Sequence, residues 1–146
     1  MNQMESPNQL RELIRELERK LGILQETQNA CCSVTLAQCH ALVEIGRAGR
    51  ISLNELSDKL DIENSSMSRT VNKLVTSNLA SRNIDPNDRR YVTISLTESG
   101  LEQFHKVEKD MNAYFQKIYT AIPENKQNQV MESIQILLDA ISKCQL

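Results

Sequence analysis

Basic and short polar side chains are concentrated between residues 65 and 90. This stretch holds five Lys or Arg and two Asp or Glu, whereas the whole chain of 146 residues has a net charge of −2. Short side chains let a helix approach DNA closely, and the N-terminus of a helix favours phosphate. Arg and Asn can reach base edges in the major groove, where Arg suits guanine and Asn suits adenine. One face of a helix over 64–78 would carry such residues: Ser65, Ser66, Ser68, Arg69, Asn72 and Lys73.

A solvated face of an ordinary amphipathic helix would have the same residue types, so the neighbouring sequence has to decide. Residues 47–90 hold eight basic and six acidic residues, whereas the rest of the chain holds nine and thirteen. Residues 47–90 are therefore mildly basic within an acidic protein, and this distribution of charge favours contact with nucleic acid.

Two adjacent arginines, Arg89 and Arg90, follow a Pro-Asn turn in the segment DPNDRR (85–90). A protruding turn has no core to pack against, and arginine fits the narrow minor groove, where the negative potential is deepest. Asp88 would hold one arginine in a fixed rotamer through a charge-assisted hydrogen bond. The alternative is an exposed loop whose charges neutralise each other.

Three cysteines and a histidine lie within ten residues: Cys31, Cys32, Cys39 and His40. Such residues can bind soft metals, and an activated thiolate can sense oxidants. Ordinary packing also explains them, because cysteine is often buried and Cys39 can pair with Val34 in a hydrophobic staple. The spacing matches no zinc site with two separated ligand pairs. We predict no bound metal and keep an effector or redox-sensing role as a hypothesis.

The sequence does not indicate an enzyme or a membrane protein. It has no glycine-rich phosphate loop and no Ser-His-Asp arrangement, so we predict neither catalysis nor a cofactor. No run of about 18 apolar residues is present, and the polar N-terminal sequence MNQMESPNQL does not resemble a signal peptide. We therefore expect a cytoplasmic protein with reduced thiols.

Long helices are predicted at both ends of the chain. Apolar residues at spacings of three and four predict helices over 8–28, 98–121 and 124–143. Thr97 is the expected N-cap of the second, and Pro123 lies at the first turn of the third. The apolar faces of the first and last of these helices are too short to form a stable coiled coil on their own. They therefore need another surface to pack against. We predict that 8–28 and 98–143 are dimerisation helices.

Three shorter helices are predicted between them. Two begin at capping boxes, Thr35 to Gln38 and Ser52 to Glu55. A short helix from 52, a tight turn and the helix over 64–78 form a helix-turn-helix.

A β-hairpin is predicted to follow the helix-turn-helix. Residues 80–84 and 91–96 should form its two strands around the Pro-Asn turn, and Val92, Ile94 and Leu96 in the second alternate with more polar residues. A hairpin in this position is a wing. The predicted fold is mainly α with a small β-hairpin wing, in a single domain of residues 1–146 whose winged helix-turn-helix covers 35–97.

These motifs resemble the MarR (multiple antibiotic resistance regulator) family. Asp88-Arg89-Arg90, Ser95-Leu96-Thr97 and Gly100 are similar to the wing signature of the family, and residues 62–69 and 74–82 resemble its recognition helix and following strand. The layout is similar over the whole chain. Asn78 stands where members often have Gly, and it is the next-best residue for a left-handed cap. Glu63-Asn64 stand where members often have Ser-Pro; a glutamate there would weaken nonspecific binding.

The resemblance implies a homodimer whose first and last helices interlock. Its recognition helices would bind a pseudo-palindromic operator in successive major grooves, roughly 34 Å apart. Arg90 would enter the minor groove with support from Asp88, and the major groove would be faced by Ser66, Ser68, Arg69, Asn72 and Lys73.

The resemblance also implies an effector, because members answer to phenolic compounds, oxidants or metals near the position of the cysteine cluster. We predict a sequence-specific regulator of transcription that binds double-stranded DNA, a repressor released by a small molecule, an oxidant or a soft metal. The alternative is a winged-helix module that binds protein and not DNA.

Overall fold

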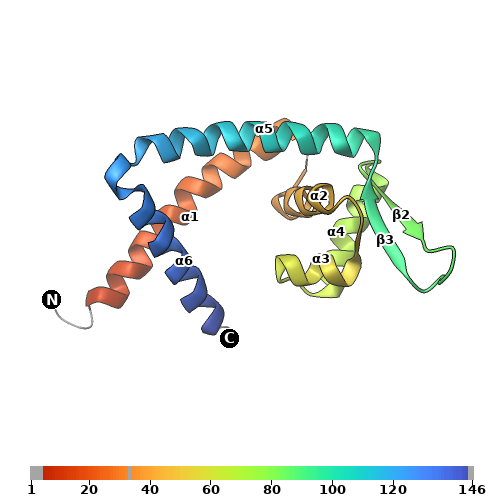
Figure 1. Cartoon of the computed structure of the whole chain (residues 1–146), viewed down its shortest axis with the longest axis horizontal. Helices are drawn as coiled ribbons and strands as arrows, with labels where there is room; N and C mark the ends of the chain where they lie inside the picture. Colours follow the sequence, from red (N-terminus) through yellow and green to blue (C-terminus); the bar gives the residue numbers. More distant parts are fainter. Residues whose placement is uncertain (1–4, 33, 145–146) are drawn as a thin grey trace. The chain divides into compact units, whose positions relative to one another are not determined.

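The computed structural model describes the backbone of residues 5–32 and 34–144, and the side chains of residues 6–22 and 34–144. The chain forms two compact units, Met1–Val107 and Glu108–Leu146. Figure 1 shows the order of the elements: α1 (Glu5–Cys32), α2 (Leu36–Ala48), β1 (Ile51–Ser52), α3 (Leu53–Leu60), α4 (Asn64–Thr76), β2 (Ala80–Ile84), β3 (Val92–Leu96), α5 (Glu98–Ala121), the 3-10 turn η1 (Glu124–Lys126) and α6 (Gln127–Lys143). The predicted class, mainly α with a small β wing, is confirmed.

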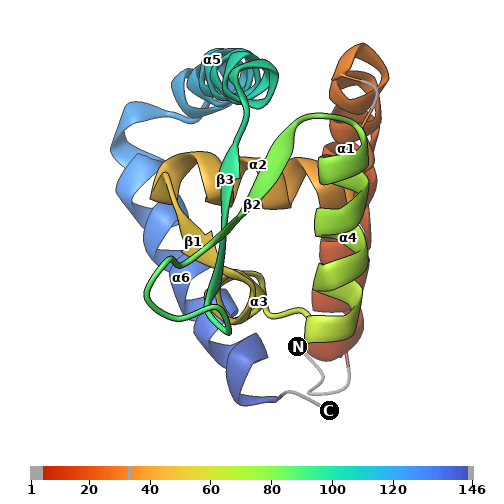
Figure 2. The same cartoon turned by 90° about the vertical axis from the view of Figure 1, so that its right-hand side faces the viewer.

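The sheet has three antiparallel strands in the order β1-β3-β2 (Figure 2). The predicted hairpin of β2 and β3 is present, with Ala80 opposite Leu96 and Ile84 opposite Val92. The third strand was not predicted, because β1 has only two residues and is too short to show an alternating pattern. Ile51 of β1 pairs with Ile94 of β3, so the wing is attached to the helix-turn-helix through the sheet.

The core of the first unit lies between α2, α3, α4 and the sheet. Met67, Val71 and Leu74 of α4 are completely buried, as their spacing of four and three residues predicted. Val75, which lies next to Leu74 on the same helix, is only half-buried. These α4 side chains join other fully buried residues: Leu42, Ile45, Leu56 and Ile94.

Two helix starts were predicted as capping boxes, and one of them is complete. Thr35 Oγ1 accepts from Gln38 N–H at 3.2 Å, and Gln38 Oε1 accepts from Thr35 N–H at 3.3 Å. At Ser52 only the first half is found, since Ser52 Oγ accepts from Glu55 N–H at 3.2 Å. The Glu55 carboxylate accepts instead from the hydroxyl of Tyr91. Ser52 is also part of β1, so tertiary pairing overrides the local motif here.

The junction between the winged helix and α5 depends on a close backbone approach. Thr97 caps α5 as predicted: its Oγ1 accepts from Gly100 N–H at 3.1 Å and donates to the Asn78 carbonyl at 2.7 Å. A Cβ on Gly100 would lie 1.9 Å from the Leu79 carbonyl oxygen, so only glycine fits. Asn78 has a φ of 60°, which confirms the left-handed position expected for it.

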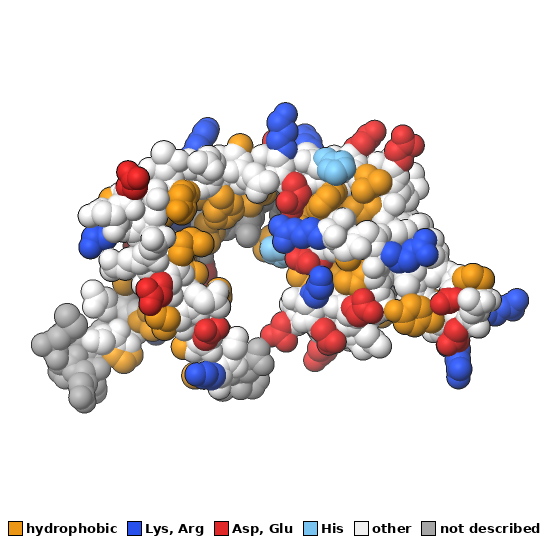
Figure 3. Space-filling view, in the orientation of Figure 1, with side chains coloured by type: hydrophobic (Ala, Val, Ile, Leu, Met, Phe, Trp, Pro, Cys, Tyr) orange, Lys and Arg blue, Asp and Glu red, His pale blue; other side chains and the backbone are white. Residues whose placement is uncertain are grey.

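The terminal helices differ slightly from the predicted ranges and expose many apolar side chains. The first is longer than 8–28, and the last begins as a 3-10 turn after Pro123. Figure 3 shows hydrophobic side chains exposed over α6. Within the described residues, no helix is both long and apolar enough to span a bilayer. Large exposed apolar residues are Leu10, Leu13 and Leu17 on α1 and Met131, Ile134, Ile136, Leu138 and Ile141 on α6.

Candidate nucleic-acid interface

The polar face of α4 is exposed, as its sequence predicted. Arg69, Asn72 and Lys73 are exposed and project from the side opposite the buried stripe. Ser65 is exposed, whereas Ser66 and Ser68 are half-buried. The structure therefore brings all six predicted residues of this helix to one surface, with short side chains near its N-terminus and longer ones from Arg69 onward.

The N-terminus of α4 is held against α3. The turn between the two helices closes through Asp61, which has a φ of 54°, and through a bond of 3.1 Å from Ile62 N–H to the Ser57 carbonyl. Asn64 Nδ2 donates to Asn54 Oδ1 at 2.9 Å, which links the first turns of the two helices. Glu63 is the N-cap, and its side chain accepts no capping hydrogen bond from the described part of the chain. The first-turn amides of α4 therefore keep their donor capacity.

Two long side chains on this face are tied within the protein. Arg69 Nη2 donates to Ser66 Oγ at 3.2 Å, one turn earlier on the helix. Arg82 of β2 donates through Nη2 to Asn72 Oδ1 of α4. Arg82 was not among the predicted site residues, because its pairing with Asn72 joins a strand to a helix and leaves no local pattern.

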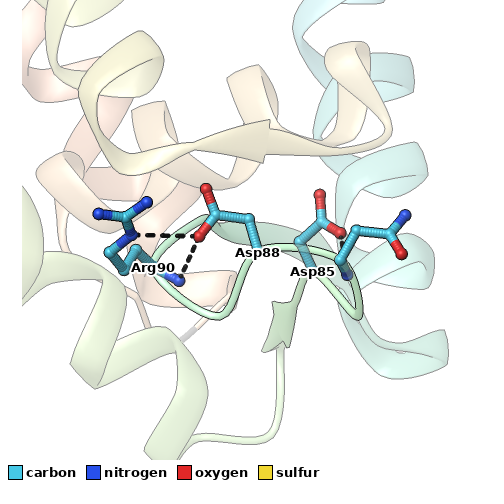
Figure 4. Close-up of polar contacts among 4 residues, drawn as sticks. Asp85, Asp88 and Arg90 are labelled. Carbon is cyan, nitrogen blue, oxygen red and sulfur yellow. Dashed lines mark hydrogen bonds and ion pairs between the residues drawn. The ribbon is translucent and has the colours of Figure 1, made fainter.

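The turn of the wing is organised by two aspartates (Figure 4). Asp85 Oδ1 accepts from Asn87 N–H at 2.8 Å, which closes an Asx turn. Asp88 Oδ1 accepts from both the backbone N–H and Nε of Arg90, at 3.0 and 3.4 Å. The Arg90 side chain is nevertheless 94% exposed and that of Asp88 is 51% exposed. An ion pair this exposed adds less than about 1 kcal/mol to stability, so its main effect is to orient the guanidinium.

The wing is closed and anchored through Tyr91. Asp85 N–H donates to the Tyr91 carbonyl and Tyr91 N–H donates to the Asp88 carbonyl, both at 3.0 Å. The Tyr91 hydroxyl donates to Glu55 Oε1 at 3.4 Å and so connects the wing to α3. Arg89 is exposed at the tip. The wing and the helix-turn-helix are therefore joined both by the sheet and by this side-chain contact.

The predicted effector residues are only partly described. Cys31 and Cys32 belong to the last turn of α1, but their side chains lie outside the described residues. Cys39 is half-buried on α2, and His40 beside it is exposed. Among the side chains that the structure describes, no group of three His, Cys, Asp or Glu is placed to hold a metal ion.

Residues 34–92 match the model of the MarR family. YdgJ of Bacillus subtilis (strain 168), an uncharacterised HTH-type transcriptional regulator, is 20% identical over 132 residues, which cover 90% of this chain and 76% of that protein. The HTH-type transcriptional repressor MdtR of the same strain is 28% identical over 74 residues, which cover 51% of this chain and 48% of that protein.

The fold is similar to that of solved structures over nearly the whole chain. Streptococcus pneumoniae FabT, solved in complex with DNA, superposes with a TM-score of 0.85 at 16% identity, covering 94% of this chain and 99% of that one. The family match covers α2 to the start of β3, which includes the exposed face of α4 and the wing. Residues 34–92 thus match the MarR family, and nearly the whole chain is similar in fold to FabT in its complex with DNA.

Proposed function

We propose that this protein binds a specific double-stranded DNA operator as a homodimer and represses transcription. The observation that carries the proposal is the arrangement of α4 and the wing, which present polar and cationic groups from two elements of one rigid module. Arg69, Asn72 and Lys73 would contact the major groove, together with Ser65, Ser66 and Ser68. Arg89 and Arg90 would contact the backbone and the adjacent minor groove.

The role of Asp88 follows from its contacts. Asp88 receives two hydrogen bonds from Arg90 while the arginine remains almost completely exposed. An oriented guanidinium loses less side-chain entropy when it enters a groove than a freely rotating one does. Asp88 would thus support binding even though its own charge is repelled by phosphate.

The proposal of a homodimer is based on the apolar surface of the terminal helices. Ile134, Ile136 and Ile141 of α6 are exposed by 47%, 61% and 55%, and Leu13 of α1 by 58%. Apolar side chains exposed in this number support an association surface on each of the two helices. A twofold dimer would place two copies of α4 on successive major grooves of a pseudo-palindromic site. Helices 8–28 and 98–143 of the sequence prediction would then serve dimerisation.

Repression is supported by the relative MdtR, whose name describes a repressor. Release would come from an effector that prefers one spacing of the two DNA-binding lobes. The sequence suggests three classes of effector: a small molecule, an oxidant or a soft metal. The candidate sensing residues are Cys31, Cys32, Cys39 and His40. The protein would act in the cytoplasm.

A direct test uses duplex DNA from the region upstream of its own gene. The purified parent should shift this duplex at nanomolar to micromolar concentrations, and Arg90→Ala should weaken the complex. Lys143→Ala is the matched control, because it removes an exposed cation at the end of α6, far along the chain from the wing. If the parent binds no duplex, or if both variants weaken binding equally, the DNA-binding proposal fails.

The effector proposal needs a separate experiment. The triple variant Cys31→Ser, Cys32→Ser, Cys39→Ser should bind DNA like the parent but resist release by peroxide or arsenite. Equal release of parent and triple variant would exclude sensing by these thiols and leave the small-molecule class.

The alternative function is a winged-helix module that binds protein. The acidic side chains of the loop between α3 and α4, Asp61 and Glu63, are exposed and would suit a basic protein surface better than DNA. Binding to a protein partner would respond only weakly to salt, whereas DNA binding falls steeply as salt rises.

A further inference from the structure

The amide of Asn72 is held by Arg82, a residue that belongs to the wing and not to α4. Arg82 Nη2 donates to Asn72 Oδ1 across ten residues of sequence. Both residues are exposed, so the pair lies on the same surface as the polar face of α4. The backbone carbonyl of Asn72 is also engaged, since it accepts from the Thr76 hydroxyl at 2.9 Å.

This contact determines which end of the amide is available. A guanidinium has only donors and stays charged at every physiological pH, so it can face the oxygen of the amide but not its nitrogen. The oxygen of Asn72 must therefore point toward Arg82. What remains for a ligand is foremost the Nδ2 group, which is a donor.

An Asn72 side chain that offers only its Nδ2 donor prefers a different base from an asparagine whose whole amide is free. The usual asparagine–adenine pair needs both ends of the amide, because the oxygen accepts from N6 while the nitrogen donates to N7. Guanine presents two acceptors, N7 and O6, at the same edge of the major groove. A side chain that offers only donors can therefore recognise it. Arg69, one turn away and fixed by Ser66, adds further donors to the surface.

We propose that Arg82 is a specificity-determining positioning residue that makes Asn72 select guanine over adenine. The inference deepens the proposed function, on which it rests. It also reverses the simple expectation from residue type, in which Asn72 suits adenine. Arg82 acts through Asn72: it decides which base is preferred at one position, in addition to any attraction its charge exerts on phosphates.

The experiment is selection of bound duplexes from a randomised library by the full-length parent and by Arg82→Met and Asn72→Ala. The position at which Asn72→Ala loses its base preference is the one that Asn72 reads. There the parent should prefer guanine to adenine by roughly 2- to 10-fold in affinity, the usual effect of one hydrogen bond. Replacement of that guanine by 7-deazaguanine should weaken binding by the parent by a similar factor. Arg82→Met should lose the preference for guanine or shift it to adenine.

Further variants and three contrary outcomes make the test decisive. Lys59→Met removes an exposed cation from the last turn of α3, to which the proposed function gives no contact with bases, and should leave the preference unchanged. Arg82→Lys, which keeps a donor and the charge, should keep the preference at least in part. Arg82→Ala, which should lose the preference, replaces Arg82→Met if that variant does not fold by circular dichroism. An unchanged preference for guanine in folded Arg82→Met, or a parent that prefers adenine at this position, overturns the inference while the proposed function stands. A parent that selects no duplex at all overturns both.

Discussion

Asp88 and Arg90 form a two-point contact in which one carboxylate oxygen accepts from the backbone N–H and from Nε of the same arginine. Because the aspartate binds both the backbone and the side chain, it fixes the turn and the direction of the guanidinium together. The arginine is nevertheless almost wholly exposed, which agrees with the proposal that this contact positions the guanidinium for DNA.

A double-mutant cycle tests this positioning role. Arg90→Ala should weaken DNA binding by roughly 10- to 100-fold, the effect of losing charged hydrogen bonds. Asp88→Ala should weaken binding when Arg90 is present. In the Arg90→Ala background the same change should be neutral or slightly strengthening, because only the repulsion between carboxylate and phosphate is then removed. Fluorescence anisotropy gives the four affinities. Stronger binding on loss of Asp88 in both backgrounds would contradict the positioning role.

Gly100→Ala should destabilise the protein, because the new Cβ would lie 1.9 Å from the Leu79 carbonyl oxygen. The backbone there has to move, and we expect the free energy of unfolding to fall by about 1–3 kcal/mol in thermal or urea unfolding. Gly22→Ala is the matched control, since nothing lies within 4 Å of its added Cβ in the middle of α1. That change should raise stability by about 0.5–1 kcal/mol. Equal effects of the two substitutions would contradict the close packing at this junction.

The start of α5 explains why the sequence signature includes a glycine there. The local signals at Thr35 and Thr97 predicted helix starts correctly, because a cap depends on residues three positions apart. The alternation of residues 91–96 and the spacing of Met67, Val71 and Leu74 are likewise visible in the sequence. The match of residues 34–92 to the MarR family, and the similarity to HTH-type transcriptional regulators, agree with the prediction of a transcription regulator.

Contacts between distant residues could not be predicted in the same way. The bonds from Arg82 to Asn72 and from Tyr91 to Glu55 join positions ten and thirty-six residues apart. In our proposal, the first of them changes which base Asn72 prefers on the polar face of α4. The second explains why the capping box at Ser52 is incomplete, because the carboxylate that should complete it binds the wing instead. Short-range spacing thus predicts which residues reach the surface but not how they constrain one another.

Ile134→Glu should break the dimer that we propose. Ile134 is 47% exposed on α6, and a carboxylate placed in an apolar contact between subunits loses its hydration without a partner. Sedimentation equilibrium should give a dimer for the parent and a lower average mass for the variant. Asn128→Asp puts the same charge at an exposed polar position in the first turn of α6 and should remain dimeric. A parent that is monomeric at micromolar concentration would contradict the proposed assembly.

The salt dependence of binding tests the central claim most directly. For the parent and Arg90→Ala, the dissociation constant for the upstream duplex is measured by anisotropy over a series of KCl concentrations. We predict that affinity of the parent falls steeply and linearly on a logarithmic plot, and that Arg90→Ala reduces the slope by about one. A parent whose binding does not change with salt, or whose slope is the same without Arg90, would contradict the account.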